Sequence, residues 1–175
     1  MPIERSNRRI SAARIARLAR ELLDASPLCA IATVGPGGAP HVNTAYFAWS
    51  PNLELVWLSE PAARHSRNLR LRPSAAVAVY EPGQTWGGRD RGIQLFGSAR
   101  EVDAAAAARA EAVYAQRFPP LRDADLRAYR FYRFRPRRMK LFDERALGAG
   151  IFVTARIGRG GEPTWERTEI YRPSG

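Results

Sequence analysis

The sequence has very little cysteine and no long apolar run. Cys29 is the only cysteine among 175 residues, so no intramolecular disulfide can form, and its place in the run LCAIATV predicts a small buried side chain. No stretch approaches the ~20 apolar residues that span a bilayer, so no membrane helix is expected. The first residues, MPIERSNRRI, are charged and lack the apolar core of a signal peptide, which favours a cytoplasmic protein.

Histidine is also scarce, since only His41 and His65 are present. Neither has a second histidine, cysteine or acid at ligand spacing, so no zinc or other metal site is predicted. The stretch GPGG, which begins at Gly35, lacks the Lys-Ser/Thr ending of a phosphate loop and joins two predicted strands. It is therefore interpreted as a turn.

Positive charge, in contrast, is abundant and is carried almost entirely by arginine. The chain has 28 Lys and Arg against 17 Asp and Glu, a net charge of +11, and Lys140 is its only lysine. Arginine binds phosphate and carboxylate through two parallel hydrogen bonds. Such a chain could attract nucleic acid, an anionic cofactor or acidic substrates, or it could reflect a codon bias, and charge alone does not choose between these.

The pattern of apolar residues predicts a mainly β chain with few helices. Helices are expected at 11–25, 61–70 and from Asp103 to Arg117, and strands at 28–34, 41–50, 53–59, 75–81, 92–102, 129–135, 139–142 and 151–157. Many short strands with few helices suggest a closed or nearly closed barrel, which removes exposed strand edges. The expected organisation is an N-terminal helix packed on the barrel (1–27), the barrel domain (28–157) and a polar, loosely ordered C-terminal tail (158–175).

The densest basic stretch, RHSRNLRLR, begins at Arg64, after the third predicted strand. Helical spacing puts Arg64, Arg67 and Asn68 on one face, and beside Ser59 they could surround a phosphate with charge-assisted hydrogen bonds. The same residues fit a solvated face of a surface helix equally well.

Two other stretches each allow two interpretations. In WGGRD, the glycines would let the backbone approach a planar ligand on which Trp86 could stack, but the segment also suits a flexible hairpin loop. In RAYRFYRFRPRR, from Arg127, arginines alternate with aromatic residues as in some nucleic-acid-binding proteins. A half-buried strand with a charged edge explains that pattern better, so nucleic-acid binding is not expected.

The order of these segments resembles the FMN-binding split-barrel family related to pyridoxamine 5'-phosphate oxidases. The resemblance rests on HVNTAYFAW, LELVWLSEPAARHSRNLRLRPSAAVAVY and RGIQLFGSAREV. It continues through VYAQRFP and KLFDERALGAGIFV, which look like an uncharacterised bacterial subfamily, and covers residues 22–157. It implies a split antiparallel β-barrel with flanking helices, and a homodimer with flavin at the subunit interface.

The resemblance also implies which residues bind the cofactor. The second strand would line the flavin, the end of the third strand and the basic helix would hold its phosphate, and the Gly-rich loop with the fifth strand would approach it from the second subunit. These positions are His41, Val42, Asn43, Thr44, Leu58, Ser59, Arg64, His65, Asn68, Trp86, Arg91 and Gln94.

The function implied is that of a flavin-dependent oxidoreductase that binds FMN, with the deazaflavin F420 as the alternative cofactor. Such an enzyme would pass a hydride or electrons between NAD(P)H and an unknown small acceptor, and no catalytic base is identified. The tail PTWERTEIYRPSG has no histidine, so oxidation of vitamin B6 is not expected, and no histidine follows His65 to bind haem. A flavin-storing or nucleic-acid-binding protein without catalytic activity remains the competing class.

Overall fold

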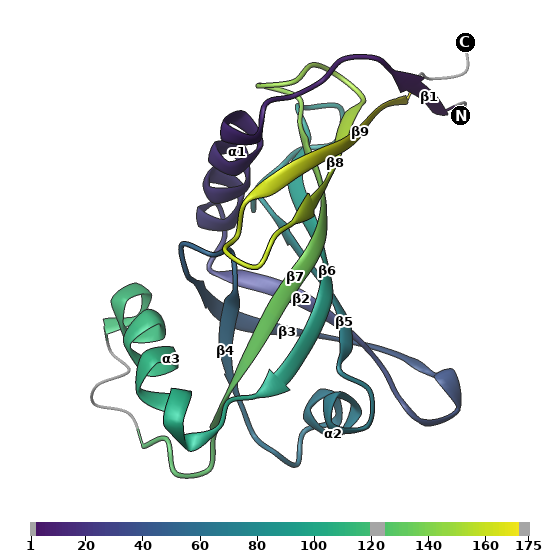
Figure 1. Cartoon of the computed structure of the whole chain (residues 1–175). Helices are drawn as coiled ribbons and strands as arrows, with labels where there is room; N and C mark the ends of the chain where they lie inside the picture. Colours follow the sequence, from purple (N-terminus) through teal and green to yellow (C-terminus); the bar gives the residue numbers. More distant parts are fainter. Residues whose placement is uncertain (1–2, 120–124, 172–175) are drawn as a thin grey trace. The chain divides into compact units, whose positions relative to one another are not determined.

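The computed structural model describes residues 3–119 and 125–171, which form nine strands and three α-helices (Figure 1). A short 3-10 turn, Pro36–Gly38, joins the second and third strands, as the GPGG stretch predicts. In chain order the elements are β1 (Ile3–Ser6), α1 (Ala12–Asp24), β2 (Leu28–Val34), β3 (Pro40–Trp49), β4 (Leu55–Ser59), α2 (Arg64–Leu71), β5 (Ser74–Tyr80), β6 (Arg91–Glu101), α3 (Ala104–Arg117), β7 (Arg130–Asp143), β8 (Ile151–Ile157) and β9 (Pro163–Tyr171).

All nine strands belong to one sheet with the order β1-β9-β8-β7-β4-β3-β2-β5-β6. An additional pairing between β7 and β6 closes six of them, β7-β4-β3-β2-β5-β6, into a ring. Neighbouring strands run antiparallel in the pairs β2–β3, β3–β4 and β4–β7. The fold is therefore a split antiparallel β-barrel with flanking helices, and the predicted fold class is confirmed.

The chain forms two compact units. The terminal unit comprises residues 1–26, 78–95 and 137–175, and the central unit comprises 27–77 and 96–136. Within the terminal unit, α1 contacts β9 and buries an apolar stripe that includes Ile15, Leu18 and Leu22. Its start is fixed by Ser11, whose hydroxyl accepts a hydrogen bond from the Arg14 backbone N–H at 3.3 Å.

The predicted loose order after Gly158 is wrong for the segment that forms β9. This strand pairs with β8 on one side and with β1 on the other. Thr168 is fully buried on it, and the Thr168 hydroxyl donates to the Arg8 carbonyl at 2.7 Å. The polar composition of this segment does not indicate loose order, because charged residues of β9 form ion pairs across the sheet, such as Glu169 with Lys140.

A second difference concerns β7, which is one strand where two were predicted. Pro136 lies in the gap between the two predicted strands, 129–135 and 139–142, and proline cannot donate a ladder hydrogen bond. In the structure it falls between residues 130–134, which pair with β4, and residues 138–142, which pair with β8. The missing N–H is thus tolerated, and the strand continues through the proline.

The core of the central unit gives the two faces of β4 different environments. Trp57 is fully buried on one face, opposite Phe47 of β3, and stacks on Tyr132 with ring centroids 6.1 Å apart. The other face carries Val56 and Leu58, which pack against α3. Because side chains alternate along a strand, Ser59 lies on the same face as Trp57.

Candidate functional site

Helix α2 begins without a side-chain cap. Its N-cap residue is Ala63, with extended backbone, and no acidic residue lies in the first turn. The predicted start at Pro61 is too early, because residues 61–63 form a turn before the helix. The first N–H groups of any helix lack intrahelical acceptors and carry partial positive charge, so this end of α2 suits an anion.

The two faces of α2 differ sharply. Arg64 and Arg67 are exposed, whereas Ser66, Asn68 and Leu69 are buried. The buried amide of Asn68 donates to the Thr33 hydroxyl of β2 at 3.1 Å, and this bond ties the helix to the sheet. Asn68 therefore positions the helix that carries Arg64, although the sequence grouped the two on one face.

Ser59, His65 and Ser66 form a hydrogen-bonded cluster beneath the start of α2. The His65 Nε2 atom lies 2.7 Å from the Ser59 Oγ atom, and the Ser66 hydroxyl donates to the same oxygen at 3.3 Å. Ser59 is the last residue of β4, so the strand end and the first turn of the helix are linked directly. Sequence analysis selected Ser59 and His65 but missed Ser66, whose only signal is a small polar residue on the buried side of the helix.

A second histidine lies beside this cluster. The rings of His41 and His65 are nearly parallel, with centroids 6.5 Å apart. Burial first, and then the charge of His41, lower the pKa of His65 below its ordinary value. Both effects favour the uncharged imidazole, and a bound anion would oppose them.

The predicted flavin-lining residues of β3 are divided between its two faces. Val42 and Thr44 are exposed on one face, whereas His41 and Asn43 are half-buried on the other. The Asn43 Oδ1 atom is buried and has no hydrogen-bond partner, so it could accept a hydrogen bond from a ligand. Leu58 of β4 packs against the α3 cluster, on the opposite face from Ser59.

Exposed apolar side chains lie on one face of the β2–β3 hairpin. Leu28 pairs with Tyr46, and Ala32 pairs with Val42. Three of these side chains are exposed, Leu28 by 41%, Tyr46 by 57% and Val42 by 62%. Exposed apolar side chains on one face of a hairpin are typical of a protein–protein or ligand contact.

The other three predicted residues, Trp86, Arg91 and Gln94, belong to the terminal unit. Trp86 is fully exposed in the loop before β6, and Gln94 is exposed on that strand. Arg91 is held in place by protein carboxylates, since its Nε atom lies 2.8 Å from Asp143 and its Nη1 atom 3.5 Å from Glu81. Burial opposes its charge, but Asp143 and Glu81 outweigh that effect and raise the pKa of Arg91.

A family model described as pyridoxamine 5'-phosphate oxidase matches residues 15–143 of the chain. The chain belongs to this family. The match ends before β8 and β9, so these two strands lie outside the family model. No curated protein matches the chain.

Solved structures share the fold of this family member. A heme-binding protein from Mycobacterium smegmatis has 20% identity and a TM-score of 0.70, and the match covers 88% of this chain and 61% of that protein. The conserved hypothetical protein Rv2991 from Mycobacterium tuberculosis has 25% identity and a TM-score of 0.65, and the match covers 83% of this chain and 92% of that protein. A pyridoxamine 5'-phosphate oxidase-related, FMN-binding protein from Nostoc punctiforme has 15% identity and a TM-score of 0.57, and the match covers 92% of this chain and 94% of that protein. This family member therefore spans less than two thirds of the length of the first of these proteins.

The structure describes residues 3–119 and 125–171. No three His, Cys, Asp or Glu side chains lie together there in a way that could hold a metal ion. None of the helices in that part of the chain is both long enough and apolar enough to cross a membrane. Cys29 is buried as predicted, and burial raises the pKa of its thiol to about 12.

The low pKa of His65 predicts a pH-dependent stability of this family member without ligand. The unfolded chain has the higher histidine pKa, so it binds more protons than the folded chain as the pH falls through that range. We expect the free energy of unfolding to decrease on acidification below about pH 7, with a slope under the ~1.4 kcal/mol per pH unit that one proton can give. Urea unfolding at several pH values measures this slope, and His65→Gln should reduce it. An equal slope in both proteins would mean that His65 is not buried against His41.

Proposed function

We propose that the protein binds FMN between the two subunits of a homodimer and acts as a flavin-dependent oxidoreductase. The observation that carries the proposal is the uncapped start of α2, where Ser59 and His65 meet beneath the exposed Arg64. Helix N–H groups, a guanidinium and a hydroxyl together match the needs of a phosphate group. Membership of the family and the FMN-binding protein from Nostoc punctiforme support FMN as the ligand.

The residues around this end of α2 fit the rest of the cofactor as well. The unpartnered Asn43 Oδ1 atom would accept a hydrogen bond from the N–H group of the flavin pyrimidine ring. Val42 and Thr44, exposed on the other face of β3, would line the bound cofactor. The flavin, when bound, supplies the redox chemistry, and the chain supplies binding, orientation and electrostatics.

The exposed surface of Leu28, Val42 and Tyr46 would be the subunit contact. It continues along β3 from the residues proposed to line the flavin, so covering it with a second copy would also enclose the cofactor. Trp86, Arg91 and Gln94 would approach the flavin from the second subunit. Reduced nicotinamide would be the electron donor, and the acceptor would be a small molecule, which the arginine-rich composition suggests is anionic.

The identity of the bound ligand tests this proposal. We expect the purified protein to be a yellow dimer, and mass spectrometry of the ligand released by denaturation should give FMN. Release of F420 would keep the fold-based site but change the cofactor, whereas heme would overturn the flavin assignment. A colourless protein that takes up neither FMN nor F420 would also overturn the flavin assignment.

Anaerobic addition of NADPH separates an enzyme from a carrier. Bleaching of the flavin absorbance supports oxidoreductase activity, and an unchanged spectrum with NADPH and NADH supports a flavin-storing protein. Binding to RNA or DNA that weakens steeply with salt would instead favour the nucleic-acid alternative.

A further inference from the structure

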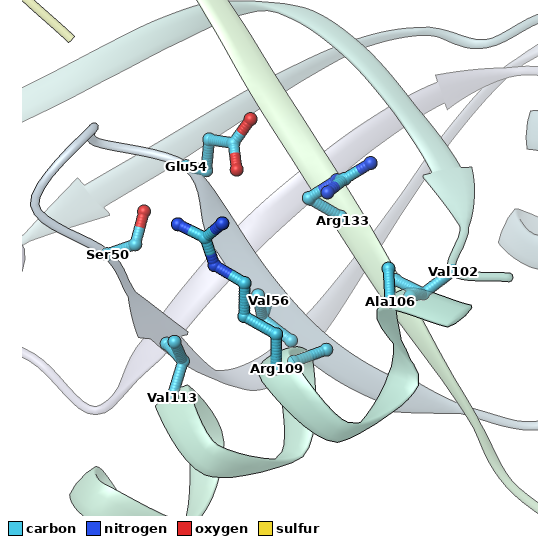
Figure 2. A pocket seen from close by; sticks show the side chains of 9 residues that line it. Ser50, Glu54, Val56, Val102, Ala106, Arg109, Val113 and Arg133 are labelled. Carbon is cyan, nitrogen blue, oxygen red and sulfur yellow. The ribbon is translucent and has the colours of Figure 1, made fainter. Parts of the chain in front are cut away.

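The central unit contains a pocket between α3 and strands β4 and β7 (Figure 2). It lies on the face of β4 that carries Val56, opposite the face of Ser59 and His65. Its floor is apolar and is formed by Val56, Val102, Ala106, Ala110 and Val113. Its rim is polar and is formed by Ser50, Glu54, Arg109 and Arg133.

The rim has an excess of positive charge. The Glu54 carboxylate is already bound by Arg135, whose Nε atom lies 2.9 Å away. Arg109 and Arg133 form no ion pair with any residue in the described part of the chain. In Figure 2 the guanidinium of Arg109 points from α3 toward Ser50 and Glu54. An anion at this rim would thus meet guanidinium groups that the protein itself leaves uncompensated.

A buried hydroxyl at the same rim lacks a partner. Ser50 is 7% exposed, and its Oγ atom makes no hydrogen bond. The turn that holds it is fixed, because the Ser50 N–H bonds the Glu54 carbonyl at 2.9 Å and the Leu53 N–H bonds the Ser50 carbonyl at 2.8 Å. Leaving a buried hydroxyl unpaired lowers stability. A ligand that accepts a hydrogen bond from the Ser50 hydroxyl would therefore bind more tightly.

We propose that this pocket binds a short-chain carboxylate. The pocket has a volume of about 20 Å³, room for one water-sized group, which suits the methyl end of an alkyl chain on the apolar floor. The carboxylate would then lie at the rim, where Arg109 can bind it through two hydrogen bonds and Ser50 can donate a third. A phosphate ion has no apolar end to place on Val56 and Ala110.

Titration of the full-length protein with butyrate, followed by NMR chemical shifts, tests the proposal. We expect saturable shifts of the amides of α3 and of the Ser50 turn, and no saturation with butanol, which has the same alkyl chain without the charge. Arg109→Gln should weaken butyrate binding about tenfold, and Glu54→Gln should strengthen it by removing the rim carboxylate. Arg109 is exposed, so the variant should fold normally.

Arg100→Gln is the matched control, since it removes an exposed arginine of the central unit that does not line the pocket. Butyrate affinity should be unchanged in this control. Absence of saturable shifts in the wild type would overturn the proposal. An equal loss of butyrate affinity in Arg100→Gln and Arg109→Gln would show general attraction of anions to a basic protein and would also overturn the proposal. Binding of inorganic phosphate as tight as that of butyrate would have the same meaning. These outcomes do not depend on flavin, because the two sites lie on opposite faces of β4.

Discussion

Alanine at position 64 is expected to weaken FMN binding about 10- to 100-fold, the equivalent of about 1.5–3 kcal/mol. Arg64 is exposed at the first position of α2, and it forms no ion pair with any residue that the structure describes. Its guanidinium is thus free to bind the phosphate of FMN. Removing it should cost little folding stability, so the change in dissociation constant reports on the ligand contact. Fluorescence titration of the ligand-free protein with FMN gives that constant.

Arg70→Ala is the control for this measurement. Arg70 is an exposed arginine of the same helix, near its other end, and its loss removes the same charge. An equal effect of both variants would mean that net charge, and not a phosphate contact at Arg64, determines affinity. An unchanged constant in Arg64→Ala would remove this residue from the site while leaving flavin binding itself intact.

The sequence predicts the fold well where local signals and packing agree. Apolar alternation gives the strands, and Asp103 begins α3 as its N-cap. The errors arise where neighbours override a local signal. Pro136 interrupts the pattern of β7 but falls between two pairing partners, and the charges of β9 are neutralised by residues distant in sequence, such as Lys140.

The candidate site, like the fold, was predicted where local signals are sufficient and missed where contacts between elements decide. Arginines near Ser59 at a strand end predict an anion site, and the resemblance to a family adds His65. Ser66 could not be found in this way, because its role depends on a 3.3 Å contact with Ser59 that requires both the strand end and the helix to be placed. Asn68 was grouped with Arg64 and Arg67 by helical spacing alone, and its contact with Thr33 depends on how α2 lies on β2.

Valine in place of Gly97 is expected to lower the free energy of unfolding by about 3 kcal/mol, the upper end of ordinary overpacking. Intrinsic preference predicts the opposite sign, because valine favours strands and glycine weakens them. The reason is the close approach of β7. A Cβ atom at position 97 would overlap the Arg135 carbonyl oxygen and would lie 2.9 Å from the Pro136 Cα atom. Both are backbone atoms, so no side chain can move aside to relieve the contact.

Ser98→Val separates this contact from the general effect of a larger side chain on β6. Ser98 is the next residue of the strand, is half-buried and already carries a Cβ atom. Its replacement should change stability by less than about 1 kcal/mol in denaturant titrations. Equal stability of Gly97→Val and wild type would mean that β6 and β7 do not approach so closely. A large loss confined to Gly97→Val would show that glycine is required where the β6–β7 pairing closes the six-stranded ring.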